Sequence, residues 1–173
     1  AGRKANSNFT LQDLKGKRVI VDHGGQPLHM FNYACHKVGL KLSDFEAIDA
    51  GSADDMVTAF KGGEGDYVHL QGPAPQQLEI EGSGVVVGRL GDWVGPCAFS
   101  SLASRSDWLE TDGAVAFVRA FRAARQWVNQ TPALHVANSE IAYFPGISVE
   151  ALTESIVAYQ ALGCCSGQVE IVP

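Results

Sequence analysis

The sequence predicts an α/β fold with a mostly parallel sheet and flanking helices. In the first half of the chain, short β-branched runs alternate with helical patterns of roughly 10–15 residues. Strands are predicted at residues 18–22, 45–49, 66–70 and 84–90. Because parallel strands are joined by right-handed crossovers, we expect 18–22 to lie inside the sheet, parallel to both 45–49 and 66–70.

The helices of this half are predicted from turn residues and apolar spacing. The Gly24-Gly25 pair frees the backbone to turn after the first strand, and Pro27 suits the first turn of a helix, where its missing N–H is not needed. The apolar residues of that helix repeat at helical spacing: Leu28, Phe31, Cys35 and Val38. Ser52 or Asp54 can cap a second helix, and a short third helix is expected around residues 76–81.

The second half of the chain is predicted to be rich in helices. Residues 112–128 form the longest helical pattern; residues 134–143 and 149–162 are expected to form two more, with Ser148 as an N-cap. Residues 97–104 suit a further strand. The apolar residues of 112–128 occupy more than one narrow stripe, so this helix needs a large partner surface. We therefore expect this half to pack on another chain or on a missing segment.

The tryptophans divide between core positions and a candidate ligand contact. Trp127 lies on the long helical pattern and Trp108 follows Asp107 in an expected helix cap, so both are expected in the core. Trp93 falls in residues 92–96, which we interpret as a connection. A tryptophan there can wall a binding cleft, and packing is the alternative.

Composition excludes two classes of protein. The net charge is −6, from 13 Lys and Arg against 19 Asp and Glu, and an acidic surface repels a phosphate backbone. A general nucleic-acid binder is therefore not expected. No apolar run reaches the roughly 18–20 residues that cross a bilayer, so no membrane span is expected either. Residues 1–8 lack the apolar stretch of a signal peptide.

The four cysteines form no CxxC motif, so the sequence offers neither a zinc knuckle nor a thioredoxin-type site. Cys35 fits a helical apolar pattern and is expected to be a small core residue. The adjacent Cys164 and Cys165 suit packing, a labile redox pair, or a partner for Cys97. No metal site or cofactor is expected.

Three loops are candidates for ligand binding, since ligands of open α/β sheets bind beyond the carboxyl ends of the strands. These loops are His23–His29, Asp49–Asp54 and Gln71–Pro75. The first combines glycines with a helix N-terminus, whose N–H groups and positive dipole end favour an anion. The alternative is a tight turn between strand and helix with surface histidines. It has neither the spacing of a dinucleotide fingerprint nor the ending of a P-loop. No nucleophile, base and orienting group assemble in the sequence.

The opening of the predicted fold resembles a known family. The run Phe9-Thr-Leu-Gln-Asp-Leu-Lys-Gly-Lys-Arg-Val is similar to the start of the second lobe in type II periplasmic solute-binding proteins of ABC transporters, those for nitrate, sulfonate, taurine and thiamine-precursor pyrimidines. The resemblance implies a βα lobe at residues 9–95, like lobe two. Residues 96–173 would then be a helix-rich return segment, like part of lobe one.

The resemblance also implies a function. The chain would bind a small polar or anionic organic solute in a cleft between lobes and deliver it to an ABC permease, in a periplasmic or other extracytoplasmic location. Its partners would be the solute, the permease, and a complementary chain or missing lobe. The implied ligand-binding residues are His23, Gly24, Gly25, Gln26, His29, Gln71 and Gly72. The alternatives are an enzyme of the thiamine-pyrimidine synthesis type and a ligand-sensing domain.

Overall fold

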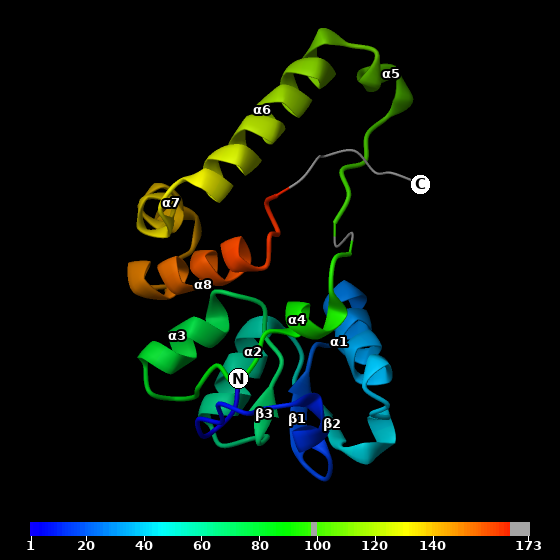
Figure 1. Cartoon of the computed structure of the whole chain (residues 1–173), viewed down its shortest axis with the longest axis vertical. Helices are drawn as coiled ribbons and strands as arrows, with labels where there is room; N and C mark the ends of the chain where they lie inside the picture. Colours follow the sequence, from blue (N-terminus) through cyan, green and yellow to red (C-terminus); the bar gives the residue numbers. More distant parts are fainter. Residues whose placement is uncertain (98–99, 167–173) are drawn as a thin grey trace. The chain divides into compact units, whose positions relative to one another are not determined.

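A small parallel sheet organises the first of two units into which the chain divides, residues 1–97 and 98–173 (Figure 1). The computed structural model describes residues 1–97 and 100–166. The sheet has the strand order β2-β1-β3, with β1 at Arg18–Val21, β2 at Glu46–Asp49 and β3 at Tyr67–Val68. Both neighbours run parallel to β1. This confirms the predicted interior position of the first strand.

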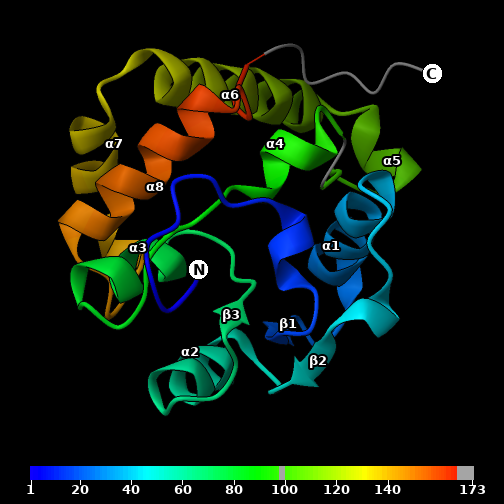
Figure 2. The same ribbon diagram turned by 60° about the horizontal axis from the view of Figure 1, so that its bottom comes forward.

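Helices cover both faces of this sheet. They are α1 (Gly25–Lys37), α2 (Ala53–Lys61), α3 (Ala74–Ile80) and α4 (Leu90–Val94), with 3-10 turns at Leu11–Leu14 and Leu42–Asp44. Figure 2 shows α1 and α2 on opposite sides of the strands. Because side chains alternate along a strand, Val19 and Val21 face the core beneath α1 and α4, whereas Ile20 faces the core beneath α2 and α3. The sheet therefore separates two apolar clusters.

The predicted strand at 84–90 is wrong. Within it, only Val85 makes a β-bridge, and its partner is Gly2 in antiparallel orientation. Gly2 exchanges both backbone hydrogen bonds with Val85, each 2.9 Å long, and it also bridges to Tyr67 of β3. The start of the chain thus occupies the free edge of β3, so residues 84–90 cannot reach that edge to join the sheet. The predicted connection at 92–96 is also partly wrong, since α4 runs to Val94.

All the regular elements among the described residues 100–166 of the second unit are helices or 3-10 turns. It holds α5 (Ser106–Leu109), α6 (Asp112–Gln130), α7 (Ala133–Glu140), a 3-10 turn at Ile141–Tyr143 and α8 (Val149–Ala161). The core lies between α7 and α8: Ala133, Val136, Ala137, Leu152 and Ile156. Ser148 caps α8 as predicted, since its Oγ accepts from the N–H of Ala151 at 3.1 Å. The strand predicted at 97–104 is absent at Cys97 and 100–104; residues 98–99 lie outside the described part.

The tryptophans of this unit are not core residues, contrary to prediction. Trp108 is 39% exposed and Trp127 is 42% exposed. The reason is that Ala114 is the one buried residue of α6, so this long helix has little apolar surface to pack against within its own unit. Trp108 instead meets Phe117 edge-on, with ring centroids 6.0 Å apart.

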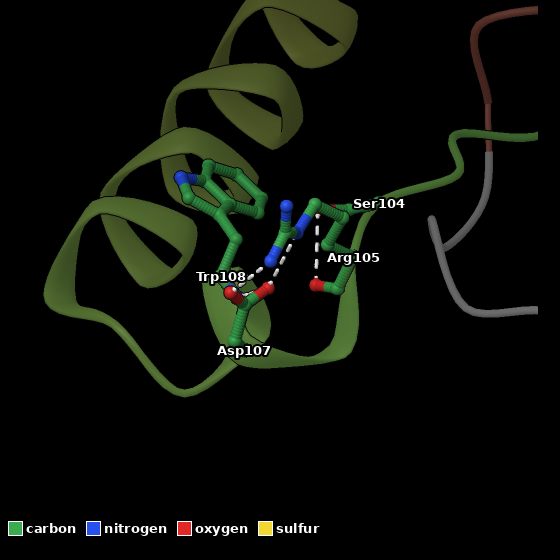
Figure 3. A network of polar contacts seen from close by, with 4 residues as sticks. All are labelled: Ser104, Arg105, Asp107 and Trp108. Carbon is green, nitrogen blue, oxygen red and sulfur yellow. Dashed lines mark hydrogen bonds and ion pairs between the residues drawn. The ribbon is translucent and has the colours of Figure 1, made fainter.

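The start of α5 is held by an ion pair and not by a capping Ser or Asp. Arg105 is the N-cap residue, and its guanidinium binds the Asp107 carboxylate at 2.7 and 3.0 Å (Figure 3). The same carboxylate accepts from the N–H of Trp108 at 3.0 Å. All three contacts are local and exposed, so they shape the turn and contribute little to stability. None of the helices described at 1–97 and 100–166 is both long and apolar enough to cross a membrane.

Candidate functional site

The turn from β1 into α1 presents a helix N-terminus at the carboxyl edge of the sheet. Gly24 is the N-cap position and, as a glycine, offers no side chain to accept from the first N–H groups of the helix. An added Cβ on Gly24 would meet nothing within 4 Å, and one on Gly25 would meet only Pro27, at 3.8 Å. The backbone of this turn is therefore open to close approach. The 13-residue helix α1 places the positive end of its dipole there.

The two glycines of this turn should respond differently to substitution. Gly25 has a φ of +69°, which is strained for any residue with a side chain, so Gly25→Ala should cost about 1–2 kcal/mol of stability. Gly24 has an extended φ of 172°, which any residue adopts, so Gly24→Ala should change stability by at most about 0.5 kcal/mol. Urea unfolding of the two variants checks this. Equal losses would show that backbone conformation is not what requires glycine at position 25.

A side-chain hydrogen bond joins the ends of two neighbouring strands beside this turn. Nδ1 of His23, which follows β1, lies 2.7 Å from Oδ2 of Asp49, the last residue of β2. The other oxygen of Asp49 accepts from the N–H of Gly51 at 3.0 Å. The Gly51 hydrogen bond, and then the one with His23, lowers the pKa of the Asp49 carboxyl below its usual range. Two of the three predicted loops therefore meet, although both side chains remain largely exposed.

A third strand brings a histidine that sequence reasoning did not select. His69 follows β3 directly, and its backbone N–H donates to the carbonyl of Ile20 at 2.9 Å. Its ring stacks on Phe31 of α1, with centroids 5.2 Å apart and planes 29° apart. Its Nδ1 is buried and has no hydrogen-bond partner among the described residues. The signal that could have found it is the strand alternation, which puts Tyr67 and His69 on one face at the carboxyl end of a parallel strand.

The other predicted site residues are placed around the same edge. Gln26 and His29 are exposed on the first turns of α1, and Gln71 is exposed in the loop that leads to α3, with the half-buried Gly72 after it. Trp93 is half-buried on α4. Its ring packs edge-on against Phe9, with centroids 6.0 Å apart, and closely against Gly88. Packing therefore accounts for the Trp93 contacts that the structure gives, and its role toward a ligand stays a prediction.

The described residues hold no cluster of three or more His, Cys, Asp or Glu side chains that could bind a metal ion. Cys35 is buried in the α1 core cluster, as predicted, and Cys97 and Cys164 are exposed. Burial raises the pKa of the Cys35 thiol to about 11. What the edge of the sheet offers is thus a set of hydrogen-bonding groups around a helix N-terminus.

The chain is similar in sequence and in fold to known proteins. The NMT1/THI5-like family matches residues 3–134. YtlA of Bacillus subtilis (strain 168), whose name describes it as a candidate binding protein, is 26% identical over 162 residues, which are 91% of this chain and 48% of YtlA. The fold is similar to that of the alkanesulfonate-binding protein SsuA from Xanthomonas axonopodis pv. citri bound to MOPS, with a TM-score of 0.58 and 16% identity, over 90% of this chain and 53% of SsuA.

The chain thus spans about half the length of the relatives that it matches, 48% of YtlA and 53% of SsuA. The family match covers most of the chain, including the whole sheet and the turn at Gly24-Gly25. The α/β fold with a parallel sheet, as predicted from the sequence, agrees with this structural similarity. The chain belongs to the NMT1/THI5-like family, and its fold is similar to that of the periplasmic-binding-protein type seen in SsuA.

Proposed function

We propose that this chain binds a small organic solute with an oxyanion head at the start of α1 and serves its uptake through an ABC permease outside the cytoplasm. The observation that carries the proposal is the open Gly24-Gly25 turn, where helix N–H groups without a side-chain cap face the carboxyl edge of the sheet. Such N–H groups and the helix dipole favour a negatively charged group. Family membership supports a binding role, and the fold is shared with a protein that binds alkanesulfonates.

The ligand residues of this proposal are those around the turn. The Gly24 and Gly25 backbone lets the oxyanion approach closely, and Gln26 and His29 add exposed side chains one helical turn apart. Gln71 and Gly72 follow the neighbouring strand β3. His23 follows β1, and its contact with Asp49 holds it at the same edge of the sheet. We assign no cofactor and no catalytic residue to this function.

A complementary lobe belongs to the same proposal. The chain spans about half of its relatives, and α6 exposes large apolar side chains, among them Val115, Phe117 and Trp127. Apolar surface of this kind is costly in water, and another lobe or chain would cover it. Analytical ultracentrifugation checks this: association with itself or with a partner is expected. A stable monomer that does not bind an apolar dye would contradict it.

The solute site is tested by replacing Gln26. Because a hydrogen bond to a ligand contributes about 1–2 kcal/mol, Gln26→Ala should weaken binding about tenfold. Calorimetric titration with MOPS as the probe measures this, with 3-morpholinopropanol as the analogue that lacks the sulfonate. The wild-type chain should bind MOPS and not the alcohol.

Gln126→Ala is the matched control for this titration, since Gln126 is an exposed glutamine on α6 in the other unit. It should leave the affinity for MOPS unchanged. Equal affinity of wild type and Gln26→Ala would remove Gln26 from the site. Equal binding of the sulfonate and the alcohol would contradict an oxyanion site altogether.

A further inference from the structure

The buried Nδ1 of His69 is a polar atom without a partner. Nearly all buried polar side-chain atoms in proteins have a hydrogen-bond partner, because an unpaired one costs about 1–3 kcal/mol. In the described part of the chain, Nδ1 of His69 has none, although the ring is held firmly by its stack on Phe31. A ring nitrogen of this kind is available to a hydrogen-bonding group from outside the protein chain.

The position of His69 points to the solute site as the source of that group. The hydrogen bond from its N–H to Ile20 extends the pairing of β3 with β1 by one residue. His69 therefore stands level with the end of β1, just before the chain enters the Gly24-Gly25 turn. Its ring lies on the face of the sheet that α1 covers, as its contact with Phe31 shows.

We propose that His69 is a further binding residue of the solute site, where its Nδ1–H donates a hydrogen bond to an oxygen of the oxyanion bound at the start of α1. The inference rests on the proposed function, because it needs a solute at that edge of the sheet. The ring of His69 would then bind the solute as well as pack on Phe31. His69 and the first N–H groups of α1 would then bind the same head group from segments that follow two neighbouring strands, β3 and β1.

The chemistry of the ring fits a neutral donor. Burial, and to a lesser degree the N-terminal ammonium, lowers the pKa of His69 to about 4, against the opposing effect of Asp22. At neutral pH the ring is therefore uncharged, with one nitrogen that donates and one that accepts. A neutral donor orients an oxyanion by hydrogen bonding, whereas the helix dipole supplies the favourable potential.

Two substitutions separate binding from packing. His69→Phe keeps a ring for the stack on Phe31 and removes both nitrogens, so it should weaken MOPS binding about tenfold. His69→Asn keeps a polar atom near the position of Nδ1 and should stay within about threefold of wild type. Wild-type affinity in His69→Phe would overturn the inference, as would an equal loss in both variants when both remain folded.

A measurement on the wild-type chain needs no substitution. Addition of MOPS should shift the nitrogen resonances of the His69 ring in an NMR titration, together with the Gly24 and Gly25 amides. The ring of His135, on α7 in the other unit, provides the internal reference and should not respond. Movement of the glycine amides without the His69 ring would overturn this inference and leave the proposed function standing. No movement at either place would overturn both.

Discussion

Replacing Phe60 by alanine should lower the free energy of unfolding of the first unit by about 3–5 kcal/mol, because it removes a fully buried aromatic ring. Phe60 lies on α2 with 0% of its surface exposed, and it packs in the cluster beneath α2 and α3. Arg3 also lies over its ring, 3.7 Å from the centroid, and Gly84 approaches it so closely that an added Cβ would stand 2.9 Å away. The cavity left by the ring would therefore remove packing contacts of α2, of the segment around Arg3 and of the segment around Gly84.

Amide hydrogen exchange of β1 measures this loss within the first unit. Phe117→Ala is the matched control, since Phe117 is 46% exposed on α6. It should cost much less, about 1 kcal/mol or below, and should leave exchange in β1 unchanged. Similar losses for the two variants would contradict the assignment of Phe60 to the core of the sheet.

The features that the sequence predicted correctly depend on short-range signals. The β-branched run at Arg18–Val21 favours a central strand, and the Gly24-Gly25 pair with Pro27 favours a helix immediately after it. Ser52 caps α2 with its side chain, which accepts from the N–H of Asp55. In each case, the residues that determine the structure lie within one turn of each other, so a single sequence holds the information.

The features that were missed depend on distant contacts. Residues 84–90 have the composition of a strand, and they are excluded from the sheet because Gly2 already pairs beside β3. Trp108 and Trp127 have core-type side chains, but α6 lacks an apolar surface within its unit to cover them. Composition reveals that a side chain is apolar and does not reveal which segment reaches it.

The candidate site also has features that the local sequence predicts and features that depend on distant contacts. The glycine turn and the three loops were predictable from the rule for parallel strands. The contact of His23 with Asp49 and the isolated Nδ1 of His69 could not be predicted without the register of the sheet. That register brings His23 beside Asp49, which is 26 positions away in the sequence, and Ile20 beside His69, which is 49 positions away. The alternation within β3 places His69 on one face of the sheet, but which residues of β1 lie beside it depends on pairing between segments far apart in the sequence.

The largely buried ring of His69 should make the first unit sensitive to acid. The pKa of His69 is lowered from its ordinary value of 6.5 to about 4, chiefly by burial. Between these values the unfolded chain binds a proton that the folded chain does not, so the free energy of unfolding falls as the pH decreases from about 6.5 to about 4. Above pH 6.5 the His69 ring is neutral in both the folded and the unfolded chain, so it does not change the free energy of unfolding. The full shift corresponds to about 3 kcal/mol.

His69→Phe isolates this contribution, because it keeps a ring against Phe31 and cannot titrate. Burial also lowers the pKa of the Ala1 amine, to about 5, but that group is present in both proteins and largely cancels in their difference. Relative to wild type, the stability of His69→Phe should therefore rise by up to about 3 kcal/mol between pH 7.5 and pH 4. Hydrogen exchange of β1 at several pH values measures the difference. A difference that is constant with pH would show that the His69 ring reaches solvent and takes up its proton in the folded state.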